Sequence, residues 1–455
     1  MRLSRFVVPY RDVRQGEHVL YDVLADRYVG VDDPTLEAIT RWGAGGKARG
    51  RDEREARQVL HEDGFLVEDR AEDDARLRAS YAEARKGVPG TLFVTLMPTL
   101  ACNLACTYCF QKDSPAFNKM PQATEDATLE WILRTVDARK LDTLKVHYFG
   151  GEPTTRKEFC LRTAEIFDAA MRARGGIFQW EMTTNGIELD LEFALAMKKF
   201  GDGGAFKVTL DGDKETHDTM RVYRDGRGSF DAIFENVKAL APHMRVRIGG
   251  NFLPGQVASF EKLIARLEES GVAKDLEGVR FKPIIDVDQA KKSGGSCTGC
   301  SSGKDETQEA RDLVQLGGAV GKRKIAAARA HAEPLETLLG PCELHWENNY
   351  TIDPDGYIYK CPAVAGRTEM AVASVGSPDP ETEAPLLKLR PWEQCGDCAY
   401  LPVCMGGCLG GKFLQTGHAR DVACKKEIFE RSFAEAIPRR YLAEFSQAPD
   451  VNQAA

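Results

Sequence analysis

Residues 91–110 read TLFVTLMPTLACNLACTYCF, an apolar run followed at once by three cysteines, Cys102, Cys106 and Cys109. The run has the length and composition of one strand, so the cysteines fall on the loop behind it. Three thiolates so close on a loop can hold three irons of a cubane iron–sulfur cluster. A tetrahedral zinc site would want a fourth ligand nearby, and this loop has none. The spacing predicts a cluster, against the alternatives of a structural zinc loop or three buried thiols.

The region around this loop alternates strand-like and helical patterns. The strand-like runs are 91–98, 144–150, 178–186, 205–212, 245–252 and 279–286, and amphipathic stretches at 125–140, 157–174, 191–200, 230–240 and 260–271 separate most of them. Such alternation implies crossover connections and a parallel sheet. Six units favour an α/β fold with a partial (β/α)6 TIM-type barrel over a closed eight-fold one.

The notable residues of this region gather where four of the strands end. The cysteine loop follows the first strand and GGEP, residues 150–153, follows the second. TTNG, residues 183–186, ends the third strand, and Asp211 with Gly212 ends the fourth. Because active sites of such sheets lie at the carboxyl ends of the strands, we expect these motifs to meet in one site.

The first 90 residues form a different zone. Short apolar runs at 5–10, 18–24 and 27–31 predict strands, and the patterns at 35–42 and 54–67 predict helices. Gly-rich residues 43–52 predict a flexible turn between those helices. The charged stretch 68–87 predicts a helical linker to the barrel.

Composition narrows the class of protein. The 455 residues carry a formal net charge of −8, whereas bulk binders of nucleic acid or anionic membranes are usually basic. The N-terminus has no apolar core of a signal peptide, and no apolar run is long enough to span a bilayer. We therefore expect a cytoplasmic protein with no nucleic-acid or membrane partner.

The 13 cysteines are unusual for such a protein. In a reducing cytosol, metal or catalytic use explains them better than disulfides do. Cys160 lies within an amphipathic pattern and is expected to be packed in the core. For Cys297 and Cys300, three readings stay open: cluster ligand, redox pair or incidental loop thiols. The other seven are Cys342, Cys361, Cys395, Cys398, Cys404, Cys408 and Cys424.

The cysteine loop resembles the signature of the radical S-adenosylmethionine (SAM) superfamily, with Tyr108 as the aromatic residue before the last cysteine. GGEP resembles that family's motif for the methionyl amine, where glycines allow close backbone approach. Residues 184–186 resemble its TNG strand end, residues 209–212 its S-L-D-G end with Thr in place of Ser, and residues 217–230 its H-D-x-x-R…G-S-F pattern. The alternative for any one of these is an ordinary turn or a helix-capping histidine.

That resemblance implies cofactors and contacts. The [4Fe–4S] cluster would bind SAM at its open iron and cleave it reductively to a 5′-deoxyadenosyl radical, while the protein supplies binding and orientation. The residues expected to contact the cofactor are Tyr108, Gly150, Gly151, Glu152, Pro153, Asn185, Thr209 and Asp211. No catalytic acid or base can be assigned from the sequence.

The C-terminal cysteines, with the block GYIYKCP at 356–362, resemble a SPASM domain, in which two auxiliary iron–sulfur clusters, expected as [4Fe–4S], are bound. The resemblance assigns Cys395, Cys398, Cys404 and Cys424 to one cluster, and Cys342, Cys361 and Cys408 to the other. A zinc-ribbon-like region is the alternative, although seven cysteines overfill one tetrahedral zinc site.

This chain departs from the fullest SPASM pattern, which has two cysteines shortly before the Gly-x4-Cys unit. Only Cys342 occupies that place. Cys297 or Cys300 could complete the cluster, another residue type could ligate it, or an open iron could bind a substrate thiolate.

The N-terminal zone resembles, by pattern and position, the winged-helix-like peptide-recognition element of ribosomal-peptide maturases. There a precursor's leader peptide pairs as an extra strand along a sheet edge. The alternative is an ordinary extension packed on the barrel. Winged-helix shapes also bind DNA, but this zone has no basic stripe.

We therefore expect a peptide maturase that installs a thioether, C–C or C–O cross-link in a ribosomally made precursor, with flavodoxin or ferredoxin as electron donor. The expected parts are 1–90, leader recognition and linker; 91–290, barrel; 291–341, bridge; and 342–455, auxiliary clusters and terminal helix. The alternatives are an epimerase or another non-cross-linking radical enzyme, an anaerobic sulfatase maturase that forms formylglycine, and a non-catalytic zinc-binding interaction protein.

Overall fold

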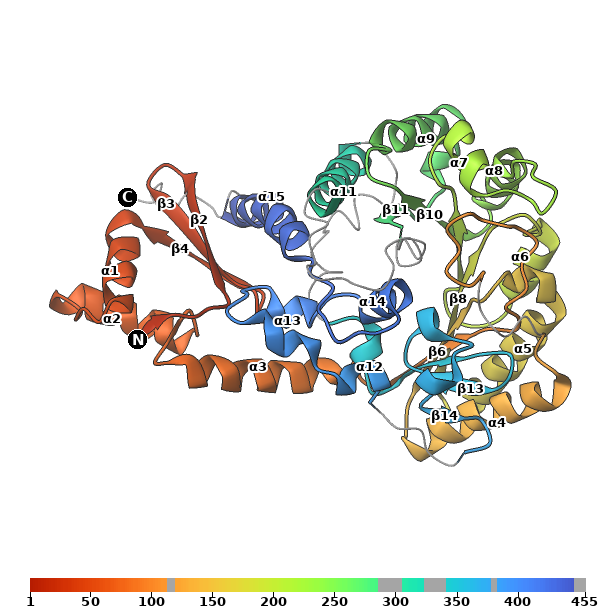
Figure 1. Cartoon of the computed structure of the whole chain (residues 1–455), viewed down its shortest axis with the longest axis horizontal. Coiled ribbons are helices and arrows are strands. Elements are labelled where there is room, and N and C mark those ends of the chain that lie inside the picture. Colours follow the sequence, from red (N-terminus) through yellow and green to blue (C-terminus); the bar gives the residue numbers. More distant parts are fainter. Residues whose placement is uncertain (113–118, 285–304, 323–340, 378–382, 446–455) are drawn as a thin grey trace.

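The computed structural model describes residues 1–112, 119–284, 305–322, 341–377 and 383–445. A large α/β unit lies at one end of the molecule and a small N-terminal unit at the other, with the cysteine-rich C-terminal segment between them (Figure 1). Cys297 and Cys300, whose role the sequence leaves open, lie outside the described residues.

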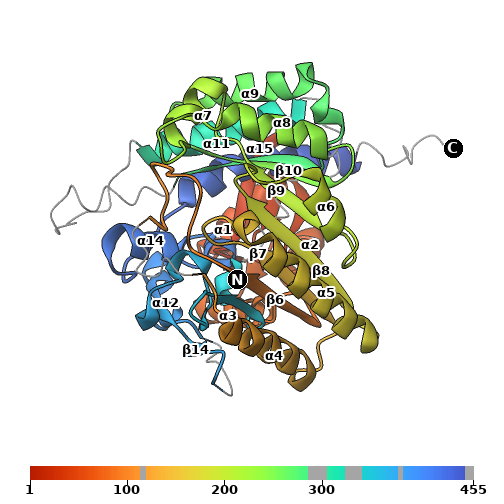
Figure 2. The same cartoon turned by 90° about the vertical axis from the view of Figure 1, so that its right-hand side faces the viewer.

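The large unit contains the six predicted parallel strands. They are β6 (Thr91–Leu96), β7 (Thr143–Tyr148), β8 (Ile177–Thr184), β9 (Ala205–Thr209), β10 (Arg245–Phe252) and β11 (Gly278–Pro283), in the order in which the chain forms them. Each pairs in parallel with the next. The helices are α4 (Gln122–Ala138), α5 (Lys157–Ala173), α6 (Leu191–Met197), α7 (Lys214–Met220), α8 (Phe230–Leu240) and α9 (Val257–Glu269) (Figure 2). The partial α/β barrel is confirmed.

Strand alternation gives this sheet two unlike faces. Leu144, Val146 and Tyr148 of β7 are fully buried in the main hydrophobic core, as are Trp180 and Met182 of β8. Successive side chains of a strand point to opposite faces. The intervening residues therefore line the inner face of the barrel, and most of them are polar.

The C-terminal segment extends the barrel sheet, which the sequence pattern does not predict. Strands β12 (Asn349–Ile352), β13 (Tyr357–Tyr359) and β14 (Ala373–Ser374) bring the sheet to nine strands. Strand β12 pairs in parallel with β6, and Tyr350 packs edge-on against Trp131 of α4. The segment that follows Cys342 is thereby fixed to the strand that carries the first cysteine loop.

The N-terminal unit holds the three predicted strands as an antiparallel sheet. These are β2 (Val7–Arg14), β3 (Glu17–Asp22) and β4 (Arg27–Asp32), with β3 in the middle, followed by α1 (Asp33–Gly43) and α2 (Gly50–Glu62). The helix predicted over 54–67 is wrong at its end, because Gly64 adopts a positive φ of 77° and stops it. Residues Leu66–Val67 instead form β5, which pairs with β1 (Arg2–Leu3).

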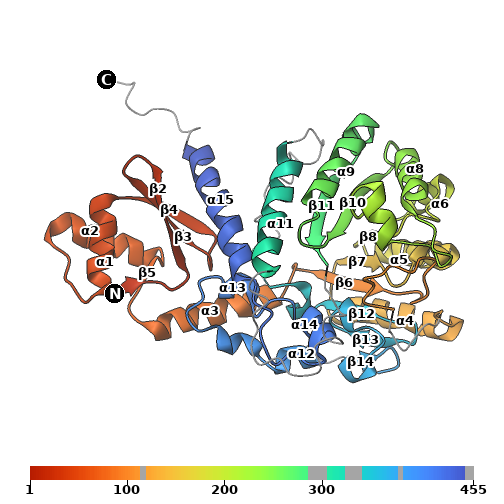
Figure 3. The same ribbon diagram turned by 45° about the horizontal axis from the view of Figure 1, so that its top comes forward.

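Two long helices connect the N-terminal sheet to the cysteine-rich segment (Figure 3). The predicted linker forms α3 (Arg70–Arg85), whose buried Asp73 accepts a hydrogen bond from Ser4 Oγ at 2.6 Å. Near its other end, the Tyr81 hydroxyl lies 2.9 Å from His345 Nδ1. In the described part of the chain, no helix is both long and apolar enough to cross a membrane.

The second connection is α15 (Lys426–Phe445), which begins two residues after Cys424. The sequence predicts a polar helix here, but one face is aromatic and packs on the N-terminal sheet, where Phe433 meets Tyr21 edge-on. Further along, the Tyr441 hydroxyl donates a hydrogen bond to Glu17 at 2.6 Å. The residues predicted to bind a cluster are thus joined directly to the N-terminal sheet.

Candidate functional site

The first cysteine loop is clamped by the segment that follows α7. The backbone N–H groups of Ala105 and Thr107 donate to the carbonyls of Val222 and Met220, at 2.8 and 2.9 Å. Arg224 donates to the carbonyl of Cys102 at 3.0 Å. Backbone pairing of this kind fixes the course of the loop, so the three thiols are held in place before any cofactor is bound.

The thiols of this loop suit a group that carries positive charge. Burial raises the pKa of Cys102 to about 12, and the charges of Glu152 and Cys106 oppose its ionisation as well. Burial also raises the pKa of Cys106, and Cys109 adds to that shift. Metal binding requires thiolates and releases these protons. The donor set therefore fits an iron–sulfur cluster, whose irons would offset the repulsion.

No single-ion site is formed by the described residues. Among them, no three His, Cys, Asp or Glu side chains are gathered tightly enough to hold one metal ion. The thiols of a cubane cluster bind to different irons rather than to one.

The GGEP loop lies directly against the start of the cysteine loop. The N–H of Gly151 donates to the carbonyl of Thr99 at 3.0 Å, and the N–H of Glu152 donates to that of Ala101 at 2.9 Å. A Cβ atom on Gly150 would lie 2.3 Å from the Thr99 carbonyl oxygen, and one on Gly151 would lie 2.1 Å from that of Ala101. Only glycine fits at either position, so the motif is explained by this contact.

The buried carboxylate of Glu152 joins the ends of β7 and β8. It accepts hydrogen bonds from the N–H of Thr154 at 2.9 Å, the hydroxyl of Thr184 at 2.6 Å and the N–H of Asn185 at 2.7 Å. These protein donors engage both of its oxygens. Glu152, expected among the cofactor contacts, therefore has a positioning role in this structure, and Pro153 is buried beside it.

Asn185 reaches the cysteine loop from the end of β8. Its side-chain amide donates to the Asn103 side-chain oxygen at 2.6 Å and lies 3.7 Å from the Cys102 sulfur. Sequence reasoning missed Asn103, which has no motif of its own beyond its place between two cysteines. The TNG strand end is thus brought against the predicted cluster loop.

A buried polar network lies where β9 and β10 end. The Tyr108 hydroxyl donates to the Asp211 carboxylate and accepts a hydrogen bond from Arg221 at 2.7 Å. The N–H of Asn251 donates to Asp211 at 2.6 Å. Thr209 lies two residues before Asp211 and is also buried. Asn251 was missed because only the pairing of β9 with β10 reveals it.

His217 supports this network from α7. Its Nδ1 accepts the N–H of Asp211 at 3.1 Å, and its Nε2 lies 3.0 Å from the Ser229 hydroxyl. Burial lowers the pKa of His217 to about 2, so the ring is neutral. Gly228 is required nearby, because a Cβ there would lie 2.1 Å from the Asp218 carboxylate carbon. The H-D-x-x-R…G-S-F pattern therefore builds the support of Asp211.

Four C-terminal cysteines enclose one small pocket, which is lined by Cys395, Cys398, Cys404 and Cys424 together with aromatic and aliphatic side chains. Burial raises the pKa of Cys404 to about 12, and the other three thiols raise it further. A Cβ on Gly407 would lie 1.8 Å from the carbonyl oxygen of Ala423, so this glycine lets the chain bring Cys424 close. These are the four cysteines that the resemblance assigns to one cluster.

The other expected group also comes together. Burial raises the pKa of Cys361, and the thiols of Cys408 and Cys342 raise it further. A Cβ on Gly410 would lie 2.9 Å from the Cys361 sulfur, so glycine is needed where α14 (Leu409–Thr416) passes this thiol. Whether Cys297 or Cys300 completes this group, another residue type does so or one iron stays open is not tested, because these two cysteines lie outside the described residues. Cys160, by contrast, is fully buried in the core, as expected.

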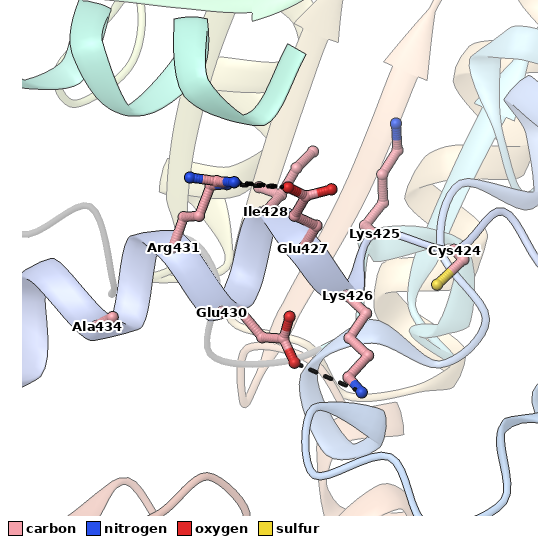
Figure 4. Close-up of a pocket in the computed structure, with 8 residues that line it drawn as sticks. All are labelled: Cys424, Lys425, Lys426, Glu427, Ile428, Glu430, Arg431 and Ala434. Atoms are coloured by element: carbon pink, nitrogen blue, oxygen red, sulfur yellow. Dashed lines mark hydrogen bonds and ion pairs between the residues drawn. The ribbon is translucent and has the colours of Figure 1, made fainter. Parts of the chain in front are cut away.

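A second pocket of about 470 Å³ runs along the start of α15 (Figure 4). It is lined by Cys424, Lys425, Lys426, Glu427, Ile428, Glu430, Arg431 and Ala434. Two ion pairs cross successive turns of the helix there, Arg431 with Glu427 at 2.8 Å and Lys426 with Glu430 at 3.5 Å. Open space therefore lies directly beside one of the cysteines predicted to bind a cluster.

Comparison with known proteins identifies the barrel. The Radical SAM superfamily model matches residues 96–267. Mycofactocin maturase of Mycolicibacterium smegmatis is 24% identical over 72% of this chain and 80% of its own length. The cysteine-type anaerobic sulfatase-maturating enzyme of Clostridium novyi is 22% identical over 73% of this chain and 93% of its own.

Solved structures share the fold. The sulfatase maturase anSMEcpe with bound AdoMet and the Kp18Cys peptide has a TM-score of 0.59 and 17% identity, and the match covers 78% of this chain and 99% of that one. Streptococcus suis SuiB bound to its precursor peptide SuiA has a TM-score of 0.52 and 12% identity, and covers 93% of this chain and 99% of that one.

Proposed function

This chain belongs to the radical SAM superfamily, and we propose that it is a maturase that cross-links a ribosomally made precursor peptide. As a member it is an enzyme that uses a [4Fe–4S] cluster and SAM. The bound cofactors supply a 5′-deoxyadenosyl radical, which removes a hydrogen atom from an unactivated C–H bond. The chain's own residues must hold the cofactors, place the peptide and exclude water.

The residues around the strand ends fit the cofactor-binding task. Cys102, Cys106 and Cys109 would hold the cluster on a loop that the protein already fixes from two sides. Glu152 and Asn185 keep the GGEP loop and the TNG strand end in register with that loop. Backbone groups next to these residues would then meet the methionyl part of SAM, because the glycines let the GGEP loop lie directly against the cysteine loop.

The C-terminal cysteines support two auxiliary clusters of the SPASM kind. The pocket shared by Cys395, Cys398, Cys404 and Cys424 and the proximity of Cys342 and Cys408 to Cys361 support this proposal. An oxidative cross-link leaves one electron that such a cluster could accept. Flavodoxin or ferredoxin is the donor that we propose for the first reduction.

The observation that best supports a peptide as the substrate is the free edge of the N-terminal sheet. Within the described residues β4 pairs only with β3, through six consecutive residue pairs. The opposite edge, β2, contains Pro9 and a bulge between Tyr10 and Arg14. A proline lacks the N–H group that a ladder needs, and a bulge interrupts pairing. Strand β4 is therefore the edge that a leader peptide would extend.

The names of the relatives agree with this proposal. SuiB was solved with a precursor peptide, and its fold covers more of this chain than that of the sulfatase maturase does, 93% against 78%. The sulfatase maturase has the higher TM-score, 0.59 against 0.52, which keeps formylglycine formation as the second candidate. The N-terminal sheet favours the first candidate, the peptide cross-linking enzyme.

The test is co-expression of the full chain with the short reading frames that adjoin its gene, followed by mass spectrometry of the peptides. A cross-link removes two hydrogens from the peptide. Formylglycine formation from cysteine removes two hydrogens and also replaces the sulfur by oxygen, and epimerisation leaves the mass unchanged. Hydrogen exchange with the modified precursor then locates its leader. We expect protection of residues 27–32 and none of residues 7–14. Protection of neither strand would refute leader recognition by this sheet.

A further inference from the structure

The inner face of the barrel is strongly basic below the cofactor site. The residues that point inward, because their neighbours point into the outer core, include Lys145, Glu181, Lys207, Arg247, Arg280 and Lys282. Glu181 is the one acidic member of that set, and Glu277 lies just before β11. Charge of one sign on a half-enclosed surface attracts ligands of the other.

The two acidic groups are already engaged at the bottom of the barrel. Arg247 donates to Glu181 at 2.9 Å and to Glu277 at 2.8 Å. Arg245 also pairs with Glu277. Two arginines and two glutamates thus form ion pairs with one another inside the protein.

Lys207 lies level with Arg247, and Arg280 and Lys282 lie further along the barrel toward the strand ends, and none of the three has such a partner among the described residues. Among the described residues no carboxylate lies within ion-pair distance of Lys207, Lys282 or Arg280. Burial lowers the pKa of Lys207 to about 8, and the charge of Lys282 lowers it as well. Burial likewise lowers the pKa of His147 to about 4; the charge of Glu181 opposes this shift, and the charges of Lys207, Lys145 and Lys282 add to it. Positive charge is therefore concentrated here, and the carboxylate that opposes it is that of Glu181, which already pairs with Arg247.

A glycine makes room for the central lysine. A Cβ atom on Gly249 of β10 would lie 2.8 Å from Cε of Lys207 and 3.5 Å from its Cγ. The lysine stem therefore lies across the backbone of the neighbouring strand. The close contact between the lysine stem and Gly249 fixes the position of Lys207 on the inner face of the barrel. This observation does not depend on the pKa values.

The position of Lys207 separates it from the cofactor contacts. It precedes Thr209 by two residues and Asp211 by four on the same strand. At about 3.3 Å per residue, its backbone lies roughly 6–7 Å deeper than Thr209 and roughly 13 Å deeper than Asp211. The strand ends would hold SAM, so the lysine faces the space beneath it.

We propose that Lys207, with Lys282 and Arg280, forms a subsite that binds a carboxylate of the peptide substrate. This inference rests on the proposed peptide substrate and adds what the peptide must present, either a C-terminal carboxylate or an Asp or Glu side chain near the modified residue. Lys207 lies beneath the cofactor contacts and Lys282 lies level with Asn251, so the subsite holds the peptide beneath and beside the cofactor through charge-assisted hydrogen bonds.

Binding of two matched pairs of synthetic peptides tests the proposal. One pair is N-acetyl-Ala-Ala-Ala as the free acid and as the amide, and the other is the amide of N-acetyl-Ala-Asp-Ala and of N-acetyl-Ala-Asn-Ala. Each is titrated calorimetrically into cluster-loaded full-length protein with excess SAM, which fills the cofactor's own carboxylate site. We expect the acidic member of at least one pair to bind about tenfold tighter, and that pair identifies the source of the carboxylate.

Variants locate the effect. Lys207→Gln should bring the acid-to-neutral ratio close to one, Gly249→Ala should reduce it by displacing the lysine, and Lys207→Arg should retain most of it. Lys274→Gln, at an exposed lysine of the turn Val272–Lys274, is the matched control and should change nothing.

Two results would overturn the subsite. One is equal binding within both pairs, and the other is a Lys207→Gln protein that binds SAM more weakly while its acid-to-neutral ratio is unchanged. In either case iron and sulfide content and SAM cleavage, measured on the same preparations, report separately on the proposed function.

Discussion

The carboxylate of Glu152 accepts a hydrogen bond from the backbone N–H of Asn185 at 2.7 Å, although 33 residues separate the two in the chain. One end of this link is the GGEP loop, which lies on the residues before Cys102, and the other is Asn185, whose amide reaches the Cys102 sulfur at 3.7 Å. The buried side chain of Glu152 thus joins two strand ends, and the side chain of Asn185 links them to the loop after a third strand, β6. The cofactor site is organised by the protein itself.

Replacing Glu152 with alanine should loosen this junction. Several buried donors would lose their acceptor, so we expect the free energy of unfolding to fall by about 2–4 kcal/mol and SAM cleavage to fall more than the cluster content. Chemical denaturation and 5′-deoxyadenosine formation measure the two effects. Glu158→Ala, at an exposed residue on α5, is the control. Equal stability of the two variants would contradict the link.

The hydroxyl of Tyr108 should matter without binding iron. In Tyr108→Phe, Arg221 and Asp211 lose their shared partner, and we expect a loss of about 1–3 kcal/mol in stability. The affinity for SAM, measured by equilibrium dialysis, should fall while iron and sulfide stay at the wild-type level. Tyr357→Phe, at an exposed tyrosine of β13, should leave both quantities unchanged. Wild-type SAM affinity in Tyr108→Phe would count against the network.

Two single cysteine replacements should behave in opposite ways. Cys404→Ala removes a thiol from the pocket that it shares with three other cysteines, so we expect about four fewer irons and four fewer sulfides per chain. Cys160→Ala changes a fully buried core thiol, and iron and sulfide should not change. Iron and sulfide analysis of both variants after the same reconstitution measures this difference. Loss of iron from the Cys160 variant would mean that the grouping of cysteines is wrong.

Gly410 offers a test that leaves every thiol in place. A methyl group there would press on the Cys361 sulfur, so Gly410→Ala should lower the content of the auxiliary cluster that Cys342, Cys361 and Cys408 are proposed to hold. The matched control is Gly376→Ala, where an added Cβ meets nothing within 4 Å. An unchanged iron content in Gly410→Ala would contradict the assignment of Cys361 as a cluster ligand at this position.

Much of the barrel was predictable because its signals are strong and local. The period-two strands and the periodic helices placed all six strands within a few residues, and the motifs fell at their carboxyl ends. Strands β12 to β14 were missed because they contain four, three and two residues, too few for a pattern to be recognised. The helical end at Leu66 was missed because a single positive-φ glycine decided it.

The site was less predictable than the fold. Motifs identified Asp211 and Glu152, but not that the protein's own donors engage both carboxylates. Asn251 and Gly249 carry no motif, and only strand pairing shows that one supports Asp211 and the other accommodates Lys207. Contacts between distant residues depend on register, which one sequence does not reveal.

Iron and acid-labile sulfide per chain, measured on anaerobically reconstituted protein, test the central claim most directly. Three groups of cysteines that each hold a cubane predict about twelve irons and about twelve sulfides. About four of each, with zinc in the remainder, would contradict the claim and leave a radical enzyme with a structural zinc-binding tail.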